Sequence, residues 1–485
     1  MMRFNRLSNK QLLIITLILL AFLAICTKYI GGIDVHDYAD VAKFFAGKYS
    51  ADIRSSHSML YSFIHVPFLI IFNSFLIMKI TNLLWLALII LSLYYISNKD
   101  RRTLLLAITS PIIWYMGPWI SPIQLAALFF LWGFFFMNKF DKTEKIKYLV
   151  LSGIFIGLAW ATWNTVFFIL SFLIISFFYG RNINHLIIFL FFVTVGLLPI
   201  LIFDQIFFGF FLYSTIRHVM ANLTVFLYGS IYPGVVQILN SWANYLSFLL
   251  MLPLFSFILF KKDFFVHRKR QVIFLTLATL FFLINPQVRY IMFLWPIFLL
   301  YLPKNLTEKQ FKIQLSLFIL LSIIVTIPYV IQIKYTTNAA DFDTGIANFG
   351  NWHFSSESRN AVISNDLNSI AKDYPNEVFL VGNDMEDYAG LAHIYWGEDI
   401  KEFVSEQDYN LYLANKSTIF EKILTFTPKI QDRRQIWIGG GLEKNENDAT
   451  DYTSIIYGIG VDKPLEADGF ELIQRYNLLY LSKKS

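Results

Sequence analysis

The stretch NHLIIFLFFVTVGLLPILIFDQI, residues 184–206, decides the fold class of this chain. As an α-helix it is long enough to cross a hydrocarbon core of roughly 30 Å, and its one charged side chain, Asp204, lies near its end. Similar stretches recur through residues 1–334, and only 15% of all residues are charged, against about 25% in soluble domains. The sequence therefore predicts an α-helical polytopic membrane protein.

We expect about eleven transmembrane helices in residues 1–334. Besides 184–206, spans are predicted near residues 11–29, 78–97, 103–117, 121–138, 148–162, 164–180, 234–260, 271–286, 289–303 and 312–333. Threading them alternately leaves 19 basic residues in cytoplasmic segments and 8 in external ones, as the positive-inside rule predicts. We therefore expect an integral membrane protein, of a prokaryotic plasma membrane by composition, with a cytoplasmic N-terminus and an extracytoplasmic C-terminal domain.

Charge divides the chain into two domains. Residues 1–334 hold 27 Lys and Arg against 10 Asp and Glu, whereas residues 335–485 hold 13 against 24. The basic excess follows from membrane topology and gives no reason to expect nucleic-acid binding. Residues 335–485 are expected to form a soluble extracytoplasmic α/β domain, with strands at 376–383, 434–441 and 470–482 and a helix at 356–374.

Two external segments are long. The first, about 30–77, contains the Pro67-interrupted apolar run SMLYSFIHVPFLIIFNSF, which predicts a helix lying at the membrane interface. The second covers about 207–233. Trp119 and Tyr232, near the ends of spans, are expected in an interfacial aromatic belt.

Polar residues gather in the first external segment, directly after the first span. A carboxylate held at the bilayer surface can act as general base on a sugar hydroxyl, and the alternative is a set of solvated loop charges and helix caps. The acidic candidates are Asp34, Asp37 and Asp40, beside Lys48, Arg54 and His57.

Arg289 lies at the outer end of a predicted span. A charge there is costly unless it is paired or faces a polar cavity, and a guanidinium suits phosphate oxygens. The alternatives are interfacial snorkelling and a salt bridge to Asp204 or to the C-terminal domain. Arg217 and His218, in the second external segment, are weaker candidates for the same role.

The motif D-x-x-x-Y-x-x-x-A…G, here Asp34, Tyr38, Ala42 and Gly47, resembles the first external loop of the polyprenyl-phosphate-sugar-dependent glycosyltransferases of the C superfamily. The resemblance is to the branch that includes protein O-mannosyltransferases and the lipid A aminoarabinose transferase. Many members carry an Asp-Glu pair where this chain has Asp34-Val35. The resemblance implies that Asp34 is the catalytic base. Two alternatives stay open for Asp37: it substitutes for the missing second acid, or its position is incidental.

Three further stretches are similar to elements of that superfamily. They are SSHSMLYSFIHVPFL (55–69), the small-residue-rich LSGIFIGLAWATWNTVFFIL (151–170), where Trp163 stands in place of a frequent Lys, and NPQVRYIMFLWP (285–296). Together with an eleven-span membrane part, the resemblance covers most of the chain. It implies that Arg289, with Arg217, Lys48 or Arg54, binds the phosphate of the donor.

The resemblance implies an inverting glycosyltransferase that moves one monosaccharide, by default mannose, from a polyprenyl (dolichyl- or undecaprenyl-type) phosphate to an extracytoplasmic glycan, lipid or protein acceptor. Tyr38, His57 and His218 would contact the acceptor or belong to the external loops, and no metal or cofactor is expected. Two alternatives stay open. One is a lipid or solute transporter, and the other is a non-catalytic relative that binds glycolipids.

Overall fold

The computed structural model describes residues 7–27, 29–31, 58–71, 75–216, 242–284, 286–335 and 469–485, with shorter stretches between these ranges. The chain divides into two compact units. The first contains Met1–Gly32, Ser74–Pro199 and Ile238–Phe354, and the second contains Ile33–Asn73, Ile200–Gln237 and Ser355–Ser485. The three segments that the sequence places outside the membrane fall largely into the second unit, while the domain boundary between 334 and 335 stays a prediction.

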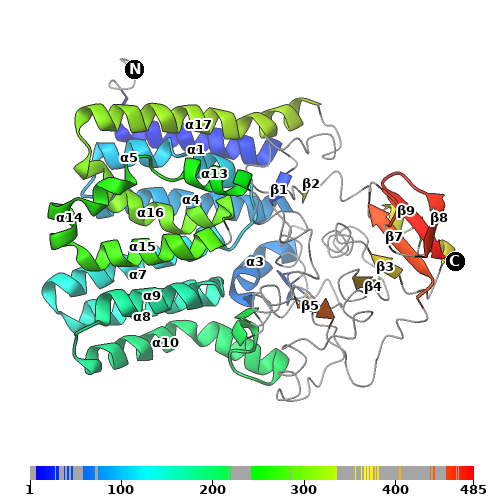
Figure 1. The fold of residues 1–485 in the computed structure, drawn as a ribbon, viewed down its shortest axis with the longest axis horizontal. Coiled ribbons are helices and arrows are strands. Elements are labelled where there is room, and N and C mark those ends of the chain that lie inside the picture. Colours follow the sequence, from blue (N-terminus) through cyan, green and yellow to red (C-terminus); the bar gives the residue numbers. More distant parts are fainter. Residues whose placement is uncertain are drawn as a thin grey trace. The chain divides into compact units, whose positions relative to one another are not determined.

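The first unit is a bundle of apolar helices that lie side by side (Figure 1). In chain order they are α1 (Asn9–Cys26), α4 (Phe75–Ile96), α5 (Arg101–Ile108), α6 (Pro111–Met116), α7 (Ile123–Thr143), α8 (Ile146–Thr162), α9 (Val166–Phe178), α10 (Ile183–Phe208), α13 (Trp242–Met251), α14 (Lys262–His267), α15 (Lys269–Ile284), α16 (Val288–Asn305) and α17 (Glu308–Tyr335), with α10 ending in the second unit. Among the described residues, five helices, α1, α4, α7, α10 and α17, are long and apolar enough to cross a membrane. The predicted class is confirmed, and the count of eleven spans stays a prediction.

One end of the bundle is basic. The turns there connect α4 to α5, α7 to α8 and α14 to α15, and they carry the lysines and arginines of 99–102, 139–147 and 261–270. We call this the basic end; in Figure 1 it is the end at which α14 lies. Polar side chains begin the helices here, as where the Asp100 carboxylate accepts a hydrogen bond from the Thr103 amide at 2.9 Å.

Close packing of α8 on α10 explains the small residues of the middle span. A Cβ added to Gly157 would lie 2.2 Å from the carbonyl oxygen of Val193, and one added to Gly196 would lie 2.2 Å from that of Ile154. Gly153 and Gly157 form a small-xxx-small pair, which lets two helix backbones approach closely. Figure 1 shows the two helices side by side.

Trp119 is not part of an interfacial belt, so that expectation is wrong. Its side chain is 1% exposed, and its indole Nε1 donates a hydrogen bond to the Tyr329 hydroxyl at 2.8 Å. That hydroxyl in turn donates to the backbone carbonyl of Tyr115 at 2.7 Å. Two polar aromatic side chains therefore join the end of α6 to α17, and Tyr232 lies outside the described residues.

The second unit contains α3 (Met59–Ile71) and the C-terminal strands. α3 is the expected Pro67-containing helix, and its position at a membrane interface stays a prediction. The described strands are β1 (Tyr29–Gly31), which the first unit contains, and β2 (Ser355–Ser356), β3 (Phe379–Val381), β4 (Phe403–Ser405), β5 (Trp437–Ile438), β6 (Gly441–Leu442), β7 (Tyr457–Val461), β8 (Phe470–Arg475) and β9 (Leu479–Lys484).

Five strands form one mixed sheet in the order β4-β3-β7-β9-β8. β3 pairs in parallel with β4 and β7, while β9 pairs antiparallel with β7 and β8. A small sheet in the C-terminal region is therefore confirmed, although β4 and β7 were not expected. The single strand expected over 470–482 is wrong, because the chain turns there and forms the antiparallel pair β8 and β9. Of the predicted helix over 356–374, only part lies within the described residues.

The turn between β8 and β9 is held by buried Asp366. Its carboxylate accepts hydrogen bonds from the Asn477 side chain at 2.7 Å and from the amides of Leu478 and Leu479 at 2.7 and 3.2 Å. Beside this turn, partial burial and the neighbouring carboxylate of Asp373 raise the pKa of Tyr476 to about 12. Its hydroxyl is thus neutral at ordinary pH and donates to Asp373 at 3.4 Å.

Candidate functional site

Three of the predicted site residues belong to the described part of the chain: Tyr38, His218 and Arg289. The first two lie in the second unit and Arg289 lies in the first. The others fall outside the described residues; they are Asp34, Asp37, Lys48, Arg54, His57 and Arg217.

Tyr38 anchors its segment on α3. The ring is 5% exposed and meets Tyr61 edge to face, with ring centroids 5.3 Å apart. Tyr61 packs in the same manner on His65, one turn further along α3, at 4.6 Å. The tyrosine of the motif is therefore a packing residue that holds the chain four positions after Asp34, and a direct acceptor contact for it stays a prediction.

A buried carboxylate lies just before the second external segment. Asp204, near the end of α10, is fully buried, and its Oδ2 accepts hydrogen bonds from the amide and the hydroxyl of Ser214, both at 3.0 Å. These bonds fix the backbone just before His218, whose side chain is half-buried. Asp204 thus has a local structural role within the second unit.

Arg289 occupies the first turn of α16, at the end of the bundle opposite the basic end. α15 starts beside the basic end at Lys269 and runs for 16 residues, or roughly 24 Å, before the chain turns into α16. The Arg289 Nε donates a hydrogen bond to the Gln287 side-chain oxygen at 2.6 Å. This bond orients the guanidinium plane, whose two Nη groups carry the other four N–H donors of the side chain.

The electrostatics of this helix end favour an anion. The N-terminus of a helix carries a partial positive charge, so a cationic side chain there is unfavourable unless an anion compensates it. The first turn of α16 contains no acidic residue. Arg289 and the helix N-terminus therefore add their positive potentials, which is the arrangement that binds phosphate and carboxylate groups.

An aromatic cluster supports the guanidinium. The Arg289 guanidinium carbon lies 5.5 Å from the centre of the Tyr290 ring. Tyr290 packs on Trp163 at 5.6 Å and on Phe282 at 5.3 Å. Trp163 stands at a position where the glycosyltransferases that the sequence resembles were expected to have lysine; here it packs on Tyr290 and adds no charge.

Lys79, in α4, is a candidate that sequence reasoning missed. The side chain is 3% exposed, and its Nζ donates to the carbonyl oxygens of Thr27 at 2.8 Å and Ala24 at 3.3 Å, at the end of α1. A cation at a helix C-terminus is favourable, so the burial of the ammonium is partly compensated. Lys79 therefore holds the point at which the chain leaves α1 toward Asp34. The available signal was a lone lysine in an apolar helix.

The bundle, its apolar helices and the small sheet define the class: an integral membrane protein of multi-helix architecture. No family model matches the chain, and no curated protein matches its sequence. Among solved structures the chain is similar to ArnT from Cupriavidus metallidurans bound to undecaprenyl phosphate, with a TM-score of 0.52 over 97% of both chains at 11% sequence identity. The same protein in the apo state gives a TM-score of 0.51 at the same coverage and identity. The chain therefore has the fold of ArnT over nearly its full length.

Proposed function

We propose that this chain is a membrane glycosyltransferase that uses a polyprenyl-phosphate-linked sugar as donor. The observation that carries the proposal is Arg289 at the N-terminus of α16, in a chain that shares its fold with a protein bound to undecaprenyl phosphate. A lipid-linked donor stays in the bilayer, so an enzyme that uses it gains from a membrane-embedded phosphate site. The donor phosphate would bind Arg289, assisted by Arg217, Lys48 or Arg54.

In the proposed reaction the Asp34 carboxylate removes the proton from an acceptor hydroxyl. The resulting oxygen attacks the anomeric carbon of the sugar, and the bond from that carbon to the phosphate oxygen breaks. The configuration inverts, the polyprenyl phosphate leaves, and the cationic site stabilises the charge that it gains. The sugar is a monosaccharide, with mannose as the first to test, and the acceptor lies on the extracytoplasmic face.

The test is sugar transfer from radiolabelled polyprenyl-phosphate sugars to a host membrane extract, with wild type compared with Asp34→Asn. Loss of a general base lowers the rate by about a hundred- to ten-thousandfold. Asp52→Asn makes the same chemical change in the same external segment and should transfer at the wild-type rate. Equal transfer by Asp34→Asn and wild type would exclude Asp34 as the base and make Asp37 the next candidate.

The same set of radiolabelled donors also distinguishes the enzyme from the two alternative classes of protein. A non-catalytic relative would bind the labelled donor and transfer none of the sugars in this set. A transporter would move the donor or another solute across proteoliposome membranes without transfer. Either result for the wild-type protein would overturn the enzymatic proposal.

A further inference from the structure

Tyr115, at the end of α6, has a buried hydroxyl that the packing leaves unpaired. The residue is 1% exposed, and in the described part of the chain its Oη has no hydrogen-bond partner. Most buried polar groups in proteins are paired, because an unpaired hydroxyl loses its hydration without a compensating bond. A tyrosine hydroxyl in such a position is explained when a ligand supplies its partner.

The surrounding contacts fix the position of this side chain. Its ring packs on Trp119 with centroids 5.1 Å apart, and its backbone carbonyl accepts the hydrogen bond from the Tyr329 hydroxyl. α6 packs against both α16 and α17. The hydroxyl is therefore held in place by neighbours that do not themselves bond to it.

The helix that carries Arg289 packs on the helix that carries Tyr115. α16, with Arg289 in its first turn, contacts α6, which ends one residue after Tyr115, and both residues belong to the first unit. A neutral phenol has one O–H to donate, and a guanidinium has N–H donors in a planar fork. An anionic oxygen between them would receive hydrogen bonds from both groups.

We infer that Tyr115 is a binding residue for the donor: its hydroxyl donates a hydrogen bond to an oxygen of the same phosphate that Arg289 binds. This inference rests on the proposed function, because it assigns a second ligand to the proposed phosphate site. No proton is transferred. The phenol stays neutral and orients the phosphate with one charge-assisted hydrogen bond.

The experiment compares wild type with Tyr115→Phe in thermal unfolding of the purified full-length protein, with and without undecaprenyl phosphate. Without ligand, the variant should unfold at the same or a higher temperature, because it removes an unpaired buried hydroxyl. Its affinity, from the ligand dependence of the unfolding temperature, should be about tenfold weaker. Undecaprenol, which lacks the phosphate, should bind both proteins equally.

Tyr301→Phe is the matched control. Its hydroxyl is buried toward the basic end, where it interacts with Asn138 and Arg268, so its loss should lower stability and leave the affinity for undecaprenyl phosphate unchanged. If Tyr115→Phe instead lowers the stability and keeps the wild-type affinity, its role is structural and the inference is wrong.

The outcomes for Arg289→Ala separate this inference from the proposed function. Weaker binding by Arg289→Ala together with wild-type binding by Tyr115→Phe would overturn only the role of Tyr115. A wild-type protein that undecaprenyl phosphate does not stabilise at all would overturn both the phosphate site and the inference.

Discussion

Arg289 is placed against the ordinary electrostatic preference of a helix. Acidic residues stabilise the first turn and basic residues the last, by typically 0.3–1 kcal/mol each. α16 has Lys304 in its last turn, as this preference predicts, but it has the arginine in its first turn, against the preference. A residue that departs from such a local preference is characteristic of a functional position.

The guanidinium itself, and not only its charge, should matter. Arg289→Lys keeps the charge but loses the planar fork and the Nε–H that bonds to Gln287. We expect the KM for the polyprenyl-phosphate donor to rise by about tenfold, which corresponds to roughly 1.4 kcal/mol of lost binding, while the unfolding temperature stays close to wild type. Donor-dependent initial rates give the KM.

Arg102→Lys provides the comparison for Arg289→Lys. Arg102 pairs with Glu308 near the basic end through a partly exposed salt bridge, 2.5 Å from Nη2 to Oε2. Surface pairs of this kind contribute little, so the donor KM should not change. A donor KM for Arg289→Lys that equals that of wild type would contradict a phosphate-binding role for the fork.

Single residues differ in how far the sequence predicts them. Arg289 was predictable from the sequence alone, because a charged residue at the end of an apolar span is costly and therefore suggests a function. Tyr115 and Trp119 were not, because tyrosine and tryptophan near span ends usually lie in the interfacial belt. Their roles depend on Tyr329, more than 200 positions away in the chain, and hydropathy carries no information about that contact.

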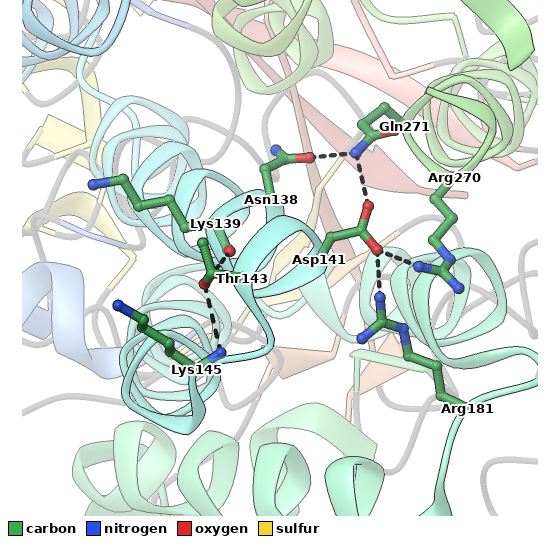
Figure 2. Close-up of polar contacts among 8 residues, drawn as sticks. All are labelled: Asn138, Lys139, Asp141, Thr143, Lys145, Arg181, Arg270 and Gln271. Carbon is green, nitrogen blue, oxygen red and sulfur yellow. Dashed lines mark hydrogen bonds and ion pairs between the residues drawn. The ribbon is translucent and has the colours of Figure 1, made fainter. Parts of the chain in front are cut away.

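At the scale of elements, one carboxylate joins two helices and the turn before a third, near the basic end. Figure 2 shows Asp141 of α7 between Arg181, which precedes α10, and Arg270 of α15; both guanidiniums bond to its Oδ1, that of Arg181 at 2.5 Å. Gln271 completes the cluster with a hydrogen bond to Asn138 at 2.7 Å. The side chains of Asp141 and Arg181 are 16% and 10% exposed, so the charges are poorly hydrated and depend on one another.

Removing this carboxylate should lower the stability of the bundle more than removing either arginine. Asp141→Ala leaves two neighbouring guanidiniums without the carboxylate that joins them, and the loss of hydrogen bonds to a charged group costs about 1.5–3 kcal/mol. Arg270→Ala leaves the Asp141–Arg181 pair intact and should cost clearly less. Thermal unfolding in detergent measures the order, with exposed Lys142→Ala as the variant expected to match wild type. Equal losses for Asp141→Ala and Lys142→Ala would show that the cluster does not hold the bundle.

Elements were predictable where hydrophobicity alone decides them. The apolar run at 184–206 is a continuous part of α10, whereas the predicted span at 103–117 is two helices, α5 and α6. The break lies at Ser110 and Pro111, because proline has no backbone N–H and starts a helix more readily than it continues one. Length and composition predict that a segment is apolar, and the proline decides where its helix ends.

At the scale of the whole molecule, the charge pattern predicts one orientation in the membrane, with the basic end in the cytoplasm. The described turns at the basic end carry most of the lysines and arginines of the bundle, and the three segments expected outside the membrane share the second unit. Hydropathy and the positive-inside rule predict such an arrangement because both depend on composition. The short strands of the second unit were only partly predicted, since their pairing links residues far apart, such as Phe379 with Tyr457.

This topology makes a prediction about accessibility. The chain has one cysteine, Cys26, so a Cys26→Ser background permits single reporter cysteines. A membrane-impermeant maleimide applied to intact cells should label Ser485→Cys in the C-terminal sheet and should label Lys142→Cys only after permeabilisation. Moving the basic turns to the outside would require the transfer of many cationic side chains across the bilayer, each at a cost of about 2.5–3.5 kcal/mol at mid-membrane. The reverse labelling pattern would show that the chain has the opposite orientation in the membrane. Asp34 and Arg289 would then lie on the cytoplasmic face, and an extracytoplasmic acceptor would be excluded.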